Sequence, residues 1–214
     1  MSRRLRGLRA RRDEGVSLIE LLVVMMIFSV LLAIVFSVLI IASRDTRDNA
    51  ARNEQVTQVR LGMMEIDRQV RSGNVISDPA AETTASSGVA ANYSLRVYTQ
   101  TDGVYHCVQW RVRFPTGKPG LLEERSWTPL WASTGEVTTW RVVARDVVAP
   151  TGTAPKPFQK VTAAGGSKAQ SIQVSLQVLS AGSRGRSTSL TSVLTGRNTV
   201  YGYPADECAS IPPP

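Results

Sequence analysis

The sequence predicts an α+β fold in which one long N-terminal helix packs on an antiparallel β-sheet. Three observations support this fold class. An uncharged apolar run covers residues 21–42, and apolar side chains recur every three or four residues in the segment after it. The second half of the chain alternates between apolar and polar residues in short segments separated by turns. One helix followed by hairpin-connected strands is an α+β pattern.

The apolar run from Leu21 to Ala42 holds about 22 residues with no charge, Pro or Gly. At 1.5 Å per residue, a helix of that length reaches roughly 33 Å, enough to cross the hydrocarbon core of a bilayer. A leader with six arginines, residues 1–15, precedes it. Because arginine-rich flanks remain in the cytoplasm, we expect a single pass through the cytoplasmic membrane with the C-terminal domain outside.

Glu20 is a charge at the edge of this apolar run. A carboxylate there is costly to bury, so a functional partner is expected. If a peptidase cut after Gly15, the new terminal ammonium of Val16 would lie about one helical turn from Glu20. The ammonium of a neighbouring, axially staggered chain could then pair with the Glu20 carboxylate and offset much of the cost of burial.

The stretch Gly15-Val16-Ser17-Leu18-Ile19-Glu20, with its basic leader and apolar run, resembles the class III signal sequence of type IV pilins and pseudopilins. The resemblance implies that prepilin peptidase cleaves between Gly15 and Val16 and N-methylates Val16. Val16 stands where Phe or Met is usual, a departure that could slow processing or methylation without abolishing it. The helix lacks the Pro of many major pilins, which favours a minor pilin or a pseudopilin.

Two ordinary membrane segments share parts of this pattern. A secretory signal peptide has a shorter apolar core and a small-residue cleavage site after it. The residues beyond the run, Ser43-Arg44-Asp45, offer no such site. A plain signal anchor has the same basic flank and apolar helix, but it gives no reason for Glu20 or for a glycine five residues earlier.

Composition argues against several function classes. The formal net charge of +8 falls to about +4 without the leader, which holds six Arg and two acidic residues. This excess does not indicate a dedicated nucleic-acid binder. His106 is the only histidine, and the chain has no phosphate loop, no CxxC and no nucleophile motif. We therefore expect no enzyme activity, no cofactor and no metal.

Beyond the membrane segment, the helix is expected to continue to about Arg71. Residues 43–53 are polar and charge-mixed, without Pro or Gly. Gly62 is a weak point, costing about 1 kcal/mol relative to Ala. The apolar positions of this half form one helix face that should pack on the chain's own globular domain: Val56, Val59, Met63, Ile66 and Val70.

A polar loop at residues 77–92 leads into the predicted sheet. In the segment 104–114, His106 is expected on the apolar face and Cys107 on the polar face. The four tryptophans should serve core and hairpin packing, and the Pro-rich tail from Tyr203 is not a strand. Strands are expected at 93–99, 104–114, 121–127, 171–180 and 187–198, and residues 137–148 are expected as a strand pair or one long strand.

The expected organisation is a leader (1–15), a transmembrane and assembly helix (16–42), its amphipathic continuation (43–72) and an extracytoplasmic β-rich domain (73–214). Segments of this domain resemble the larger minor pseudopilins of the J-type and related minor pilins. They are Val108-Gln109-Trp110-Arg111-Val112, Leu121-Leu122 with Arg125, and Leu190-Thr191-Ser192-Val193 with Arg197-Asn198.

Two features outside the signal could carry contacts. Cys107 and Cys208 are expected to form a disulfide, adding about 3–5 kcal/mol, although two unpaired thiols are the alternative. Arg184 and Arg186 lie in a Gly-rich segment, expected as a flexible tip, that could touch DNA or another anionic surface. A solvated loop is the simpler interpretation of that segment.

These features predict a structural subunit of a type IV pilus-like or type II secretion-like fibre, located in the cytoplasmic membrane and then at the cell surface. The expected partners are prepilin peptidase, other pilin or pseudopilin subunits, the pilus assembly platform and, before assembly, membrane lipid. One alternative is an extracellular binding subunit, an adhesin or a DNA-uptake subunit. Another is a signal-anchored sensor or enzyme that retains residues 1–15. The sequence does not distinguish pilus, secretion and competence machines.

Overall fold

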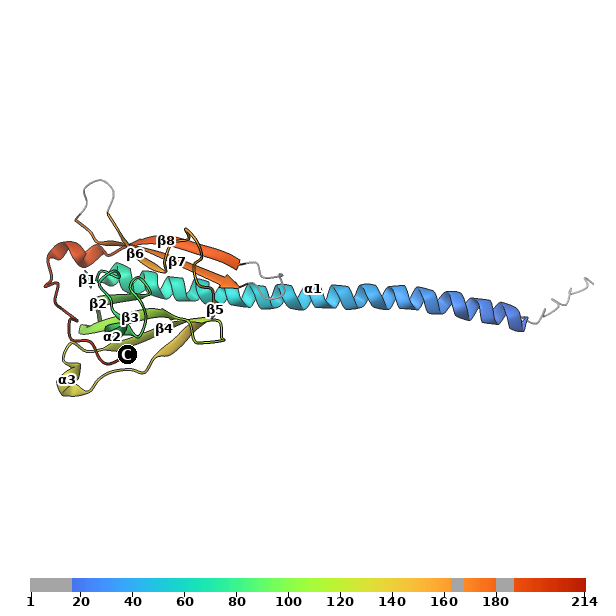
Figure 1. The fold of residues 1–214 in the computed structure, drawn as a ribbon, viewed down its shortest axis with the longest axis horizontal. Coiled ribbons are helices and arrows are strands. Elements are labelled where there is room, and N and C mark those ends of the chain that lie inside the picture. The colour runs from blue at the N-terminus through green and yellow to red at the C-terminus, as the bar shows by residue number, and fades with distance from the viewer. Residues whose placement is uncertain (1–16, 163–167, 180–186) are drawn as a thin grey trace, which may run out of the picture. The chain divides into compact units, whose positions relative to one another are not determined.

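The computed structural model describes residues 17–162, 168–179 and 187–214 (Figure 1). The chain divides into two compact units, residues 1–46 and 47–214. Helix α1 (Leu18–Ser72) is the long helix, and the second unit also holds the short helices α2 (Thr84–Ser87), α3 (Trp131–Thr134) and the 3₁₀ helix η2 (Arg197–Tyr201). The strands are β1 (Val75–Ile76), β2 (Ser94–Thr101), β3 (Val104–Arg113), β4 (Gly120–Trp127), β5 (Arg141–Val147), β6 (Phe158–Val161), β7 (Ser171–Leu179) and β8 (Ser187–Thr195).

The described strands form one antiparallel sheet in the order β1-β2-β3-β4-β5-β7-β6, with β8 on the other edge of β7. β2 and β3 pair in full register from Ser94↔Arg111 to Thr101↔Val104. β5 meets β7 at the single pair Val147↔Val178. The sheet curls at this narrow junction, so that β7 and β8 lie on one side of the C-terminal part of α1 and β2 to β4 on the other (Figure 1).

The amphipathic half of α1 supplies the centre of the core. Val59, Ile66 and Val70 are fully buried, and each contributes about 1.5–3 kcal/mol by leaving water. Val56 and Met63 are half-buried, so the predicted apolar face is confirmed. The sheet residues in the same core come from all eight described strands: Ile76, Leu95, Val97, Val108, Trp110, Val112, Leu122, Ala144, Val147, Phe158, Ile172, Val174, Leu176, Val178 and Leu194.

Gly62 of α1 packs closely against side chains of β4 and β5. A Cβ atom built on this glycine would lie 2.9 Å from Cδ2 of Leu122 and 3.3 Å from Cγ1 of Val143. The absence of a side chain therefore permits the helix and sheet to pack at this distance. The cost in helix propensity that the sequence predicts is offset by this packing.

The long helix and the longer strands of the prediction are confirmed, although β5 occupies only Arg141–Val147 of the predicted segment 137–148, and the shortest strands were missed. β1 and β6 have two and four residues, too few for an alternating pattern to be distinctive. The last strand ends at Thr195 rather than Asn198, because η2 follows. The expected loop at 77–92 contains α2. His106 is half-buried, not a core residue, because it lies near the exposed start of β3.

The larger correction concerns the polar face of β3. Cys107 and Gln109 are fully buried there, and Arg111 is 7% exposed. This face is covered by the segment that contains α2 and by the C-terminal tail, both of which lie over β3 and β4 in Figure 1. The sheet is thus buried on both faces at this point, whereas a single covered face was expected.

Candidate functional site

The described part of the chain begins at Ser17, and α1 starts one residue later. The carbonyl oxygen of Ser17 accepts hydrogen bonds from the backbone N–H groups of Glu20 (2.9 Å) and Leu21 (3.1 Å). Glu20 is therefore in the first helical turn, where a carboxylate interacts favourably with the positive end of the helix dipole. The predicted cleavage residues Gly15 and Val16 lie outside the described residues.

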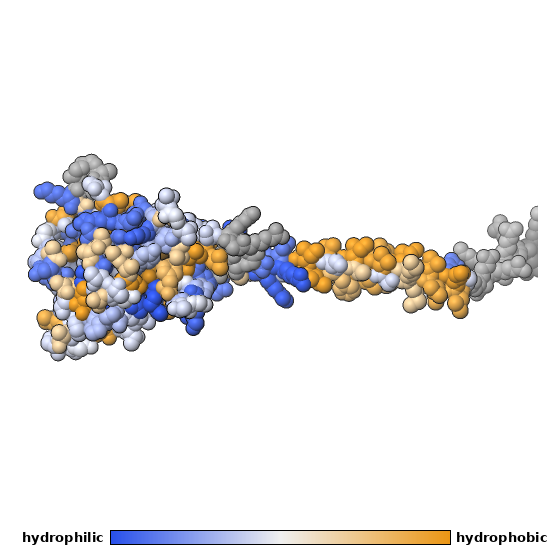
Figure 2. Space-filling model, in the orientation of Figure 1, coloured by the Kyte–Doolittle hydropathy of each residue, from blue (hydrophilic) through white to orange (hydrophobic). Residues whose placement is uncertain are grey.

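Between Leu18 and Ile41, α1 presents large apolar side chains that are exposed. Their exposed fractions run from 38% at Leu32 to 81% at Leu18. None of the most apolar part of α1 is buried. Figure 2 shows this surface as a continuous hydrophobic band. By length and composition, the helix can cross a membrane.

Polar groups inside this band are satisfied within the helix itself. The Ser29 hydroxyl donates to the Met26 carbonyl oxygen at 2.8 Å, and Ser37 donates to Ala33 at 2.7 Å. Such internal pairing removes the penalty of placing a hydroxyl in hydrocarbon. The Glu20 carboxylate differs, because no side chain among the described residues pairs with it.

A second concentration of polar groups lies on the face of β2, β3 and β4 that turns away from α1. The strand register places Gln109 opposite both Arg96 and Arg125, and Arg111 opposite Glu123. These side chains are neighbours on one face because cross-strand partners point the same way. We call the following set the arginine cluster: Arg96, Arg111, Arg113, Arg125, Glu82, Glu123 and Gln109.

Glu123 is held between two guanidinium groups. Arg111 Nε donates to its Oε2 at 2.7 Å, and Arg113 Nη2 donates to its Oε1 at 2.7 Å. Burial by itself would raise the pKa of Glu123, but the hydrogen bonds from Arg113 and Arg111 outweigh this effect and lower the pKa. The carboxylate is therefore ionised at neutral pH, as a buried ion pair requires.

Arg125 has a different environment, because its direct hydrogen-bond acceptors are neutral oxygens. Its Nη2 donates to Oε1 of Gln109 at 2.8 Å and to the carbonyl oxygen of Pro212 at 2.9 Å. Its Nη1 donates to the carbonyl oxygen of Pro213 at 2.5 Å. Burial, with repulsion from Arg111, lowers the pKa of Arg125 to about 10, so the group is still charged at neutral pH.

Trp140 supports this concentration of positive charge. The guanidinium carbon of Arg111 lies 3.7 Å from the ring centroid, and that of Arg125 lies 4.5 Å from it. Both contacts are short enough for cation–π attraction, which strengthens when water is excluded. The aromatic face thus partly compensates two like charges that are buried near each other.

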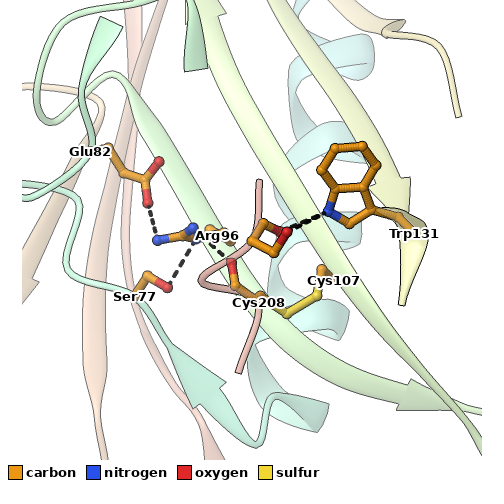
Figure 3. Close-up of a disulfide and its surroundings, with 7 residues drawn as sticks. Ser77, Glu82, Arg96, Cys107, Trp131 and Cys208 are labelled. Carbon is orange, nitrogen blue, oxygen red and sulfur yellow. Dashed lines mark hydrogen bonds and ion pairs between the residues drawn. A yellow bond between two sulfur atoms is a disulfide. The ribbon is translucent and has the colours of Figure 1, made fainter. Parts of the chain in front are cut away.

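Arg96 connects the α2 segment to the tail (Figure 3). Its Nη2 lies 2.9 Å from Oε1 of Glu82, and its Nη1 donates to the carbonyl oxygen of Cys208 at 2.8 Å. Its Nε donates to the Ser77 hydroxyl at 3.2 Å. One side chain on β2 therefore holds two segments that lie far apart in the sequence.

A disulfide and a tryptophan fix the tail at its other contacts. Cys107 on β3 is bonded to Cys208 in the tail, with the Cα atoms 5.7 Å apart (Figure 3). Trp131 Nε1 donates to the carbonyl oxygen of Ser210 at 3.1 Å. The last three residues of the tail are prolines, which have no N–H, so they can offer only carbonyl oxygens to the donors of the sheet.

The arginine cluster was not predicted from the sequence, because the strand pattern identifies a polar face but does not show which segments cover it. One signal was available in the pairing of Arg111 and Arg113 on one strand with Glu123 on the next. A second was the tail, whose prolines leave carbonyl oxygens that need donors. Neither signal specified that these two segments meet.

The other sequence-predicted features form no site in the described residues. No group of three His, Cys, Asp or Glu residues within them is placed to bind a metal. Trp110 and Trp127 are core residues, while Trp131 and Trp140 are half-buried and support the tail and the arginine cluster. Arg184 and Arg186 lie outside the described residues.

Comparison with known proteins bears on the N-terminal segment. A family model described as the prokaryotic N-terminal methylation motif matches residues 10–36. No curated protein and no solved structure matches the chain. The matched residues cover the predicted cleavage site, Glu20 and the first part of the apolar band. The chain therefore carries, at residues 10–36, the N-terminal methylation motif that marks the signal of type IV pilins and pseudopilins.

Proposed function

We propose that the chain is a minor pilin or pseudopilin, a structural subunit of a type IV pilus-like or type II secretion-like fibre. Prepilin peptidase cleaves it after Gly15 and methylates Val16. The mature helix anchors the subunit in the cytoplasmic membrane, with the domain outside, until the assembly platform adds it to the fibre. The observation that carries this proposal is the methylation motif, which matches residues 10–36. It overlaps an exposed apolar helix in which Glu20 is the only charged residue between positions 18 and 42.

Assembly follows from the surface of α1. Lipid tails cover the apolar band as well as another helix does, so apolar contact alone does not favour the fibre over the membrane-inserted state. A desolvated ion pair between neighbouring subunits adds that selection. Four residues of a helix span roughly 6 Å along its axis, so a neighbour shifted by about one turn would bring its Val16 ammonium to Glu20 if the mature helix begins at Val16. This pair sets the axial register between subunits.

The minor-pilin assignment rests on two further features. No proline interrupts α1 from Leu18 to Ser72, unlike the helices of many major pilins. The domain has the strand and arginine pattern that resembles the J-type pseudopilins. The disulfide and the arginine cluster also suit a domain that folds outside the cytoplasm and stays folded under load.

The decisive experiment is the mass of the mature N-terminal peptide, measured in membrane fractions and in material sheared from the cell surface. A methylated terminus at Val16 is the expected result. A chain that begins at Met1 or Ser2 in cells that make prepilin peptidase contradicts the proposal. It would instead support the rival function, a signal-anchored extracellular domain.

A further inference from the structure

The sheet has a long edge, which is formed by β8. This strand pairs with β7 in continuous register from Ser171↔Thr195 to Leu179↔Ser187, and no other strand in the described part of the chain pairs with it. Its nine residues read STSLTSVLT, without charge, Pro or Gly. β8 therefore presents a regular and uncharged edge to its surroundings.

The hydrogen-bond pattern shows which backbone groups of β8 point away from β7. The Gly196 N–H donates to the carbonyl oxygen of Gln170 at 3.0 Å, one step beyond the pair Ser171↔Thr195. In an antiparallel ladder, hydrogen-bonded pairs alternate with pairs that are not hydrogen-bonded. The even-numbered residues of β8 therefore bond to β7, and the odd-numbered residues direct their N–H and C=O groups outward.

Two hydrogen bonds on the other side of β7 agree with this assignment. The carbonyl oxygen of Gln177 accepts a hydrogen bond from the Val148 N–H at 2.8 Å, and the Ser175 N–H donates to the carbonyl oxygen of Pro157 at 2.9 Å. Gln177 and Ser175 thus bond away from β8, so their partners on β8 bond away from β7. The outward backbone groups belong to exposed residues and have no hydrogen-bond partner within residues 17–162, 168–179 and 187–214: Ser189, Thr191, Val193 and Thr195.

The two ends of the strand order, β1 and β6, are protected against strand pairing. β1 has only two residues. β6 has four, contains Lys160 and follows Pro157, and its Phe158 N–H donates to the carbonyl oxygen of Asn92 at 3.0 Å. Short length, lysine and proline are devices by which proteins prevent pairing at a sheet edge. β8 has none of these devices, so its edge is suited to bind a partner.

We propose that β8 pairs with an extended, uncharged strand of a different fibre subunit, one that carries the same kind of N-terminal signal. The proposal deepens the fibre function and rests on it. Only an extended backbone offers alternating N–H and C=O groups at the spacing of those on β8, so the edge itself specifies a strand as its partner. Because β8 has no charge, a charged partner side chain would lose water there without gaining an ion pair.

The direction of β8 fits a side-by-side contact between subunits. In Figure 1, β8 runs along the part of α1 that belongs to the second unit. A strand added there lies beside the domain, which is compatible with neighbouring helices that run in the same direction with a shift of about one turn. Two copies that met through this same edge would instead form a closed two-fold dimer, which leaves no axial shift. The partner is therefore a different subunit.

Photo-crosslinking in cells tests the strand pairing with the full chain. The photo-reactive residue p-benzoylphenylalanine replaces Ser189 in one variant and Val193 in another, and crosslinked peptides from the sheared surface fraction are identified by mass. The expected peptide comes from a second protein with an N-terminal methylation motif, and the sites labelled by the two probes lie four residues apart. Paired strands keep this spacing because each probe labels its cross-strand neighbour. A probe at Lys118, an exposed residue in the turn between β3 and β4, is the control and should not label that segment.

A proline variant tests the backbone hydrogen bonds of the edge. With the probe at position 193, Ser189→Pro should lower the crosslinked fraction about tenfold, because it removes an outward N–H while the bonds to β7 remain. Ser189→Ala keeps this N–H and should leave the fraction unchanged. Equal fractions in the two variants overturn the proposal. If Ser189→Pro does not fold, the four-residue spacing of the labelled sites still decides the question.

Three other outcomes overturn the proposal, and they are distinguishable. Crosslinks between two copies of the chain show that the edge joins identical subunits. Cleaved chains in the surface fraction that give no crosslink, or labelled sites without the four-residue spacing, leave the fibre function intact and exclude strand pairing. Chains that retain residues 1–15 and stay in the membrane refute the fibre function itself.

Discussion

The Nη2 group of Arg125 donates a hydrogen bond to the carbonyl oxygen of Pro212 over 2.9 Å, linking β4 to a tail residue 87 positions later. The same guanidinium reaches Pro213 and Gln109. Its several N–H groups donate hydrogen bonds to a segment whose prolines have no N–H group to donate. The free energy that holds the tail therefore depends strongly on this one side chain.

Replacing Arg125 by methionine should release the tail and lower stability by about 1–3 kcal/mol. The variant keeps an apolar stem but leaves Gln109 and two tail carbonyl oxygens without donors, while relief of repulsion with Arg111 offsets part of the loss. The measurement is the unfolding temperature in detergent, with hydrogen exchange of the tail amides. Arg141→Met is the control, because Arg141 forms a pair with Glu124 in which its side chain is 64% exposed, and should cost less than about 1 kcal/mol. Equal stability of the two variants would show that Arg125 does not hold the tail.

Replacing both cysteines by alanine should lower stability by about 3–5 kcal/mol. Cys107 and Cys208 are 101 residues apart, and a closed loop of that length strongly restricts the unfolded chain. Thermal unfolding with and without reductant measures the effect. Reductant should lower the unfolding temperature of the natural chain toward that of the double variant and leave the double variant unchanged. An unfolding temperature of the natural chain that stays the same with reductant would contradict this prediction.

Acid should destabilise the domain through Glu123. Its folded pKa is lowered from the model-compound value of 4.5, so the unfolded state takes up this proton first as the pH falls. The stabilisation is complete above the unfolded pKa and is lost as the pH falls through the folded pKa, that is, below about 4.5. Unfolding temperatures measured from neutral pH to about pH 3 should show a shallower acid loss for Glu123→Gln, together with lower stability at neutral pH. Glu124→Gln is the control, and acid profiles of equal slope for Glu123→Gln and the natural chain would refute the assignment.

Glu20→Ala should leave membrane insertion and leader cleavage intact and remove the subunit from the fibre. The apolar helix still enters the membrane, but the Val16 ammonium of a neighbour loses its partner. Immunoblots of membrane and sheared fractions measure the distribution, and peptide mass measures cleavage. Ser29→Ala in the same helix is the control, since its hydroxyl bonds internally and should have no role in assembly. Normal assembly of Glu20→Ala would exclude the ion pair.

Elements with a long, regular pattern were predictable from sequence. α1 was expected to end at about Arg71 and ends at Ser72. β3 and β7 lie where alternation predicted them, because successive side chains of a strand point to opposite faces and one of those faces packs on α1. β1 and β6 were not found, since they exist only as partners of longer strands.

The sequence by itself determined the N-terminal signal, the apolar helix, its amphipathic continuation and the strands that alternate. Each of these depends on residues close together in the chain, whose spacing fixes which face is apolar. Only the tertiary structure decided that the polar face of β3 is buried, and that Arg96 meets the carbonyl oxygen of Cys208 across 112 residues. These arrangements depend on which distant segments pack together, and local periodicity carries no information about that choice.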